Sequence, residues 1–196
     1  MRPISLLRTL ACVAAAGLAT TAAAQSWSDP GLGLGGFVSL SDGRSSDGPT
    51  FGGSLHVRYR LTASLGLEGR LGYRQETVDD GSGPLLQVVD LPLMGTGQLF
   101  FLPRTRVQPF LLAGAGLHVV RTKPEGRNPD TDTVTEALFA MHAGAGLDVR
   151  PSRRSAIHLD ARWVFLDPTA TADLAGAGYD VSSGYLWISL GVTFFR

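Results

Sequence analysis

The sequence has almost no cysteine, no excess charge of either sign and few long apolar segments. Among its 196 residues there is one cysteine, and 17 Lys and Arg residues balance 17 Asp and Glu residues. Phosphate binding needs clustered positive charge, so this balance argues against nucleic acid as a partner. Beyond the N-terminal segment, no stretch is apolar over the roughly 18 residues that indicate a transmembrane helix. A membrane-spanning helix is therefore not expected.

What the sequence does have at its start is the pattern of a secretory signal. Arg2 and Arg8 precede an apolar segment over 10–19, and three alanines over 22–24 form a small-residue cleavage site. We therefore expect a signal peptide over 1–24. Its removal takes away the one cysteine, so the exported chain is expected to fold without a disulfide and to depend on burial and hydrogen bonding.

The rest of the chain alternates between apolar and polar residues with a period of two. In the segment 55–61, every second residue from Leu55 is apolar, while His56, Arg58 and Arg60 lie between them. Such alternation is typical of β-strands with two unlike faces. Most of these segments reach the ~9–11 residues that a tilted membrane strand needs. The expected strands are 32–40, 51–62, 65–74, 86–100, 107–120, 137–150, 155–166 and 184–195.

The connections between these segments alternate in length. Short connections are expected at 62–65, 101–106 and 151–154, and long ones at 41–50, 75–85, 121–136 and 167–183. Short periplasmic turns and long outer loops are typical of bacterial outer-membrane barrels. Prolines inside two of the strands remove a backbone donor, so we expect a β-bulge at Pro92 and a strand that begins at Pro109.

The predicted fold class is all-β, an eight-stranded antiparallel up-and-down transmembrane barrel. An even strand number returns both termini to the periplasm. The predicted organisation is a signal peptide over 1–24, a short periplasmic lead-in over 25–31 and the outer-membrane β-barrel domain over 32–196.

The direction of the apolar face separates a membrane barrel from a soluble one. A soluble, lipocalin-like barrel would turn its charged faces to water. The aromatic residues favour the membrane, because they gather near both ends of the strands, like the interfacial belts of membrane barrels. Those near the long connections are Phe51, Tyr73, Phe139, Trp163, Phe165, Tyr185 and Trp187, and those near the short turns are Tyr59, Phe100, Phe101, Phe110, Phe194 and Phe195.

Several short motifs carry a resemblance to a known family. They are Leu91-Pro92-Leu93, Gln108-Pro109-Phe110 running into Gly114-Ala115-Gly116, the segment 143–148 (Ala-Gly-Ala-Gly-Leu-Asp) and the aromatic end of the last strand. In these the chain resembles the small eight-stranded outer-membrane barrels, OmpA-like and OmpX-like, including the outer membrane protein beta-barrel family. The resemblance implies a monomer among outer-membrane lipid and lipopolysaccharide, assembled by the barrel-assembly machinery through its C-terminal strand. It implies an architecture and no particular activity.

The charged strand faces meet in the lumen if the apolar faces point to lipid. An eight-stranded barrel is only wide enough to be filled by its own side chains, and buried ions must pair. Glu68 is expected to lie opposite or diagonal to Arg58 or Arg60 across the 62–65 turn. Across the 151–154 turn, Asp148 and Arg150 are expected to approach His158 and Asp160. We interpret the set as a structural plug, made of Arg58, Arg60, Arg70, Arg74, Arg150, Arg162, Glu68, Asp148, Asp160, His56 and His158.

Catalysis or metal binding is the alternative role for these residues. Lipid A deacylases and palmitoyl transferases are barrels of this size, and Ser54 with His56, or His158 with Asp160, come nearest to their machinery. Neither pair supplies a nucleophile, a base and a carboxylate within hydrogen-bond reach. Two residues on one face also provide at most half of a metal's coordination shell. No catalytic, cofactor-binding or metal site is therefore assigned, and neither an enzyme activity nor a cofactor is expected.

The long connections are acidic, whereas the short turns carry the bases Arg104, Arg106, Arg153 and Arg154. Acidic loops would repel lipopolysaccharide unless divalent cations bridge them, although ordinary loop solvation explains them as well. We expect a structural or surface-interaction barrel; a narrow pore is the first alternative and a lipid A-modifying enzyme the second. The acids are Asp42, Asp47, Glu76, Asp79, Asp80, Glu125, Asp130, Asp132, Glu136, Asp167, Asp173 and Asp180, against Arg44, Arg121, Lys123 and Arg127.

Overall fold

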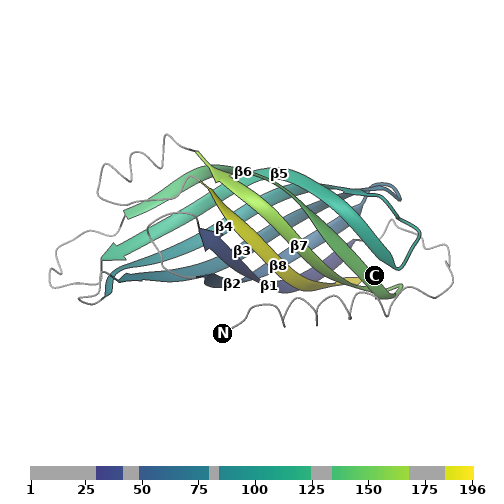
Figure 1. Ribbon diagram of the computed structural model, residues 1–196, viewed down its shortest axis with the longest axis horizontal. Coiled ribbons are helices and arrows are strands. Elements are labelled where there is room, and N and C mark those ends of the chain that lie inside the picture. The colour runs from purple at the N-terminus through teal and green to yellow at the C-terminus, as the bar shows by residue number, and fades with distance from the viewer. Residues whose placement is uncertain (1–29, 42–48, 80–83, 125–133, 168–183) are drawn as a thin grey trace, which may run out of the picture.

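Eight antiparallel strands close into one barrel (Figure 1). The computed structural model describes residues 30–41, 49–79, 84–124, 134–167 and 184–196. Each strand pairs with its neighbours in the sequence, and β1 pairs with β8, so the predicted fold class is confirmed. The strands are β1 (Gly31–Ser41), β2 (Thr50–Arg60), β3 (Leu65–Asp79), β4 (Pro84–Phe100), β5 (Val107–Pro124), β6 (Val134–Ser152), β7 (Ser155–Leu166) and β8 (Gly184–Phe195).

Strands β3 to β6 are longer than the sequence pattern predicts. They have 15, 17, 18 and 19 residues, whereas each of the other four has 11 or 12. Most of the extra residues lie at the end opposite the C-terminus, where these hairpins reach farthest (Figure 1). The pattern assigned 75–79 and 121–124 to loops, and this was wrong. Ladder pairs such as Glu76 with Val88 continue to satisfy the backbone groups there.

The sequence analysis also made predictions for the N-terminal segment and for the long loops. The predicted signal peptide over 1–24 lies outside the described residues, as do most residues of the predicted long loops. Strand β1 begins at Gly31, one residue before the strand predicted over 32–40. Among the described residues, no helix has the length and apolar character needed to cross a membrane.

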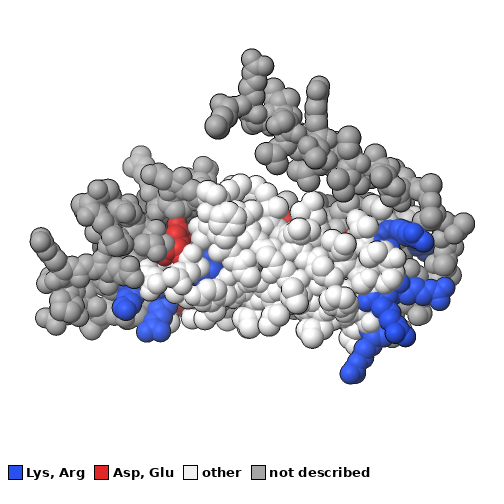
Figure 2. Space-filling view, turned by 90° about the horizontal axis from the view of Figure 1, so that it is seen from below, with Lys and Arg blue, Asp and Glu red and all other residues white. Residues whose placement is uncertain are grey.

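Strand alternation sorts the side chains between the lumen and the outer wall as predicted. In β2, Leu55 and Val57 are more than half exposed, whereas His56 and Arg58 are buried. Strands β3 and β7 repeat this arrangement. In the space-filling view, an uncharged band separates the charged side chains near the two ends (Figure 2). The apolar outer wall and polar interior are those of a membrane barrel.

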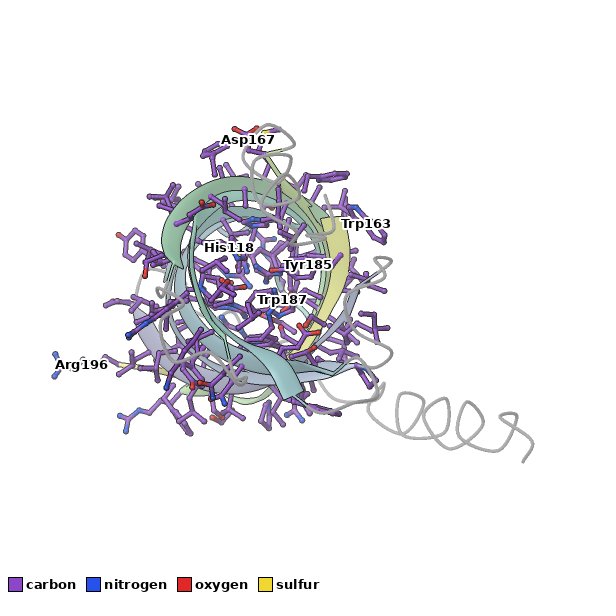
Figure 3. The ribbon with its side chains drawn as sticks, turned by 90° about the vertical axis from the view of Figure 1, so that its left-hand side faces the viewer. His118, Trp163, Asp167, Tyr185, Trp187 and Arg196 are labelled. Carbon is purple, nitrogen blue, oxygen red and sulfur yellow. The ribbon has the colours of Figure 1, made fainter. Side chains whose placement is uncertain are left out.

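The predicted aromatic belts are only partly correct. Phe100, Phe110, Tyr185 and Trp187 are buried in the lumen and do not face lipid. The prediction used position along the strand and ignored the alternation of faces, which places these side chains inward. The end-on view shows Tyr185 and Trp187 inside the barrel and Trp163 outside (Figure 3). Exposed aromatics that do fit the belts are Phe51, Tyr73, Phe139, Trp163 and Phe165 at one end and Tyr59, Phe101 and Phe194 at the other.

Pro92 does not form the predicted bulge. It pairs in register with His118 of β5, and the β3–β4 register is the same on both sides of it. The proline ring points into the lumen opposite Gly72, where an added Cβ would lie only 2.8 Å from the ring Cγ atom. A glycine in this position therefore accommodates the proline without a change of register.

Pro109 does not begin its strand as predicted, because β5 starts at Val107. The missing donor falls where the β4–β5 ladder ends. There, the Phe101 N–H donates to the Pro109 carbonyl at 3.0 Å. The proline has no N–H to donate back to Phe101, so this pair has a single hydrogen bond. A proline is tolerated at such a ladder end.

Candidate functional site in the barrel lumen

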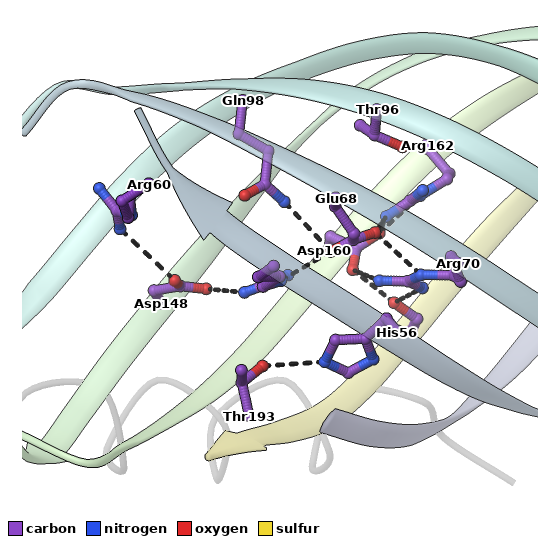
Figure 4. A network of polar contacts seen from close by, with 12 residues as sticks. His56, Arg60, Glu68, Arg70, Thr96, Gln98, Asp148, Asp160, Arg162 and Thr193 are labelled. Carbon is purple, nitrogen blue, oxygen red and sulfur yellow. Dashed lines mark hydrogen bonds and ion pairs between the residues drawn. The ribbon is translucent and has the colours of Figure 1, made fainter. Parts of the chain in front are cut away.

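The centre of the lumen holds a network of arginines and carboxylates (Figure 4). Glu68 of β3 lies directly opposite Arg58 of β2 in the strand register, as the short turn between them predicts. Its Oε2 accepts a hydrogen bond from Arg58 Nε at 2.6 Å, and its Oε1 accepts one from Arg70 Nε at 2.9 Å. Arg162 of β7 approaches the same Oε1 atom at 3.4 Å. One buried carboxylate thus contacts arginines from three strands.

Asp160 of β7 is the second carboxylate of this network. Its Oδ1 accepts from Arg162 Nε at 2.7 Å, and its Oδ2 lies 3.3 Å from Arg70 Nη2. Ser189 of β8 donates its hydroxyl to the same Oδ2 and accepts a hydrogen bond from Arg70 Nη1 at 2.9 Å. Gln98 of β4 adds a hydrogen bond to Glu68 at 3.2 Å. Polar side chains from five strands therefore hold this group in place.

Asp148 of β6 completes the network on the side of the short turns. Its Oδ1 lies 2.8 Å from Arg58 Nη1, and its Oδ2 lies 3.8 Å from Arg60 Nη2. Asp148 also faces His158 across the β6–β7 register, as predicted. Because β2 and β6 stand four places apart in the closed order of eight strands, the Arg58 contact crosses the lumen. The contacts of β3 with β7, made by Glu68 and Asp160, cross it in the same way.

Below the network, near the short turns, the lumen is filled by aromatic and apolar side chains. Phe100, Phe110 and Leu112 form a buried cluster. The Arg60 guanidinium lies 3.1 Å from the centre of the Phe100 ring, and its Nη2 donates to Gln108 Oε1 at 2.7 Å. Gln108 in turn donates to two turn carbonyls. The inner end of the lumen is therefore packed and tied to the β4–β5 turn.

Above the network lies a second buried cluster, built on Trp187. The Trp187 ring stacks on Phe37 at 3.8 Å between centroids and on Tyr185 at 6.4 Å. Met94 and Val164 fill the remaining space beside them. The residues of both apolar clusters were either predicted to lie in the outer aromatic belts or not assigned to a face. The sequence analysis therefore did not predict that apolar layers lie on both sides of the ion network.

The outer end holds a smaller ion group that the sequence analysis missed in part. Asp90 of β4 lies 3.0 Å from Arg74 Nη2 and 3.1 Å from His118 Nδ1. The Arg74 guanidinium lies 4.6 Å from the centre of the Tyr185 ring. Asp90 shares a face of β4 with inward-facing Met94, and His118 shares a face of β5 with inward-facing Leu112, so strand alternation could have identified both. Figure 3 shows His118 beside Tyr185 from this end.

The residues considered for catalysis or metal binding are buried among structural contacts. Ser54 and His56 both lie in the lumen, and His56 Nε2 lies 2.8 Å from Thr193 Oγ1. The rings of His56 and His158 meet edge to face at 4.7 Å. Asp160 is engaged by two arginines and Ser189 instead of by His158. Within the described ranges, no three His, Cys, Asp or Glu side chains gather as a metal site would require.

The same barrel architecture is found in known proteins. The family model of the outer membrane protein beta-barrel domain matches residues 9–194. Neisserial surface protein A is similar in structure, with a TM-score of 0.62, 11% sequence identity and coverage of 89% of this chain and 100% of that chain. Ail of Yersinia pestis, in complex with the heparin analogue sucrose octasulfate, has a TM-score of 0.59 and 17% sequence identity, and the match covers 86% of this chain and 99% of that chain. OprG of Pseudomonas aeruginosa has a TM-score of 0.55 and 12% sequence identity, and the match covers 87% of this chain and 95% of that chain. None of the curated proteins matches by sequence.

Proposed function

The chain belongs to the outer membrane protein beta-barrel domain family, and we propose that it is a non-enzymatic barrel with a closed lumen. On this proposal, the interior serves as a rigid core that supports the surface loops. The chain is an outer-membrane protein, so the proposal concerns what the barrel does there.

The observation that carries this proposal is the set of ion pairs across the lumen. Arg58 to Asp148, Arg70 to Asp160 and Arg162 to Glu68 each join strands on opposite sides of the barrel. Buried ion pairs resist separation, because removing one partner leaves a desolvated charge. Apolar clusters lie on both sides of these pairs. A continuous water path would have to pass all three layers, and eight strands leave little room for one.

Planar-bilayer recording on the refolded, exported chain tests the closed lumen. We expect little or no current, whereas the Glu68→Ala chain, with its arginines released, should give more frequent small openings. Stable steps like those of a 16-stranded porin would contradict the proposal. Brief, small steps from the unmodified chain would favour the narrow-pore alternative.

Lipopolysaccharide is the partner that we propose for the outer rim. Arg121 and Lys123 are exposed on one face of β5, close to the β5–β6 connection. Cations at the outer rim of the barrel can contact the phosphate groups of lipopolysaccharide. This attraction offsets the repulsion between those phosphates and the acidic loops. The Arg121→Gln and Lys123→Gln chain should retain less lipopolysaccharide than a chain with Arg153→Gln and Arg154→Gln at the other end. Equal retention by the two chains would contradict this role.

We also propose a processing and assembly route for the chain. The predicted signal over 1–24 is cleaved on export, and β8, which ends in Phe194 and Phe195, is the segment read by the barrel-assembly machinery. The product is a monomer. N-terminal sequencing of the membrane-embedded protein should give a start near Gln25, and cross-linking in the membrane should give no specific dimer.

A further inference from the structure

The outer wall carries a shallow apolar groove across strands β3 to β6. Its volume is about 570 Å³. Its sides are formed by leucines that include Leu61, Leu67 and Leu111, each about half exposed. Its floor contains Gly97, Ala113 and Ala143, which lie side by side in the strand register. Small residues between protruding leucines thus form the floor of a shallow apolar channel.

The groove floor is open to substitution. An added Cβ at Gly97 would meet only the Ala113 carbonyl oxygen, at 3.7 Å, which is an ordinary contact. Gly97 is therefore not required by the packing of the barrel, unlike the glycines beneath the lumen side chains. The absence of a side chain at Gly97 leaves space in the groove on the lipid-facing wall.

One end of the groove lies beside a basic turn. Leu61 belongs to the β2–β3 turn, and Ser64 of that turn accepts a hydrogen bond from the Phe100 N–H at 2.8 Å. The chain then continues directly into the turn 101–106, which exposes Phe101, Leu102, Arg104 and Arg106. Together these residues make an apolar surface edged by positive charge.

The charge at this end is of one sign. The turns 61–64, 101–106 and 153–154 contain four arginines and no Asp or Glu. Figure 2 shows blue side chains projecting at this end, beyond the uncharged band. Short turns mark the periplasmic side, so the cations stand at the height of the inner-leaflet headgroups of the outer membrane.

We propose that the groove binds an anionic phospholipid of the periplasmic leaflet. One acyl chain lies over Gly97 and Ala113 between the leucines, and the phosphate-bearing headgroup contacts Arg104 and Arg106. Charge complementarity selects the anionic lipid over a zwitterionic one, because each juxtamembrane arginine contributes to the attraction of an anionic surface. Phosphatidylglycerol is the lipid used to test this proposal.

Native mass spectrometry of the refolded barrel with phosphatidylglycerol or phosphatidylcholine tests the site. We expect phosphatidylglycerol to remain bound preferentially. Replacing Arg104 and Arg106 by Gln should reduce its binding by about fivefold for each arginine and remove the preference. The Gly97→Leu and Ala113→Leu chain, which fills the groove, should lose binding of both lipids.

A matched control comes from a second depression in the outer wall. Gly53 lines it and has open space outside its Cα, and its described lining contains no Lys or Arg. Gly53→Leu should therefore leave phosphatidylglycerol binding unchanged. Folding of every variant is checked by heat-modifiable mobility in gels.

Three results would overturn the proposal. They are equal binding of the two lipids by the unmodified chain, unchanged binding after the groove is filled, and a dimer whose cross-links place a second copy over Gly97.

Discussion

The lumen contains two ion groups in which carboxylates pair with arginines, and the two groups are arranged differently. In the central network, Glu68, Arg70 and Arg162 have fully buried side chains and join opposite strands. In the outer group, Asp90 joins Arg74 and His118, which come from the two strands beside its own. The Arg74 side chain remains 16% exposed. The ion pairs of the central group therefore brace the barrel across its diameter, whereas those of the outer group join only adjacent strands.

This difference sets what each group costs to disrupt. A charge in the central network has no route to water when its partner is removed, so its desolvation penalty remains. Arg74 can recover part of its hydration from the outer mouth. Burial and the span of the contacts, more than the number of ion pairs, should decide the effect of a substitution.

The largest effect is expected for Glu68→Ala. The change leaves Arg58, Arg70 and Arg162 without a shared carboxylate and should lower the free energy of unfolding by about 3–5 kcal/mol. Urea unfolding in lipid vesicles, followed by tryptophan fluorescence, measures it. Glu68→Gln controls for lost volume and should recover only a minor part of the loss. An unchanged or higher midpoint would mean that Glu68 does not serve as the shared partner.

A smaller effect is expected when the packing of the central layer is disturbed without a change of charge. Gly33 faces the lumen beneath His56, and an added Cβ would lie 2.1 Å from the imidazole Nε2. Gly33→Ala should therefore cost about 1–3 kcal/mol through overpacking. Gly53→Ala on the outer wall, where no atom lies within 4 Å of an added Cβ, is the control and should be nearly neutral. Equal costs at the two sites would show that the interior has spare room.

The smallest effect is expected for Asp90→Asn in the outer group. The amide retains a hydrogen-bonding oxygen and Arg74 is partly hydrated, so the loss should be about 1 kcal/mol. The same vesicle assay compares it with Asp160→Asn, which removes a charge from the central network and should cost more. If Asp90→Asn proves as costly as Asp160→Asn, the distinction between the two groups fails.

The sequence was sufficient for the fold and for contacts between neighbouring strands. Glu68 could be placed opposite Arg58 because a short turn fixes the register of a hairpin. The contacts of Arg58 with Asp148 and of Arg70 with Asp160 could not be predicted, since each joins residues 90 positions apart. Barrel closure and strand tilt decide which side chains meet there.

Other errors came from incomplete use of strand alternation. Trp187 was placed in an outer belt although it shares a face with Ser189, which points inward. Asp90 and His118 were not predicted to lie in the lumen, because β4 and β5 are mostly apolar and their polar face is only weakly marked. The strand ends of β3 to β6 could not be located from a pattern that fades where both faces meet water.

The unequal strand lengths give the barrel a slanted rim. Strand β6 has 19 residues and β8 has 12, and seven further residues at ~3.3 Å each, tilted by ~45°, add roughly 16 Å of height. The hairpins β3–β4 and β5–β6 thus project farther at this end than the strands on the β8–β1–β2 side of the barrel. Within the described residues, the inner faces of the two long hairpins, where they extend beyond the shorter strands, therefore point toward the β8–β1–β2 side, a direction that the strand lengths fix.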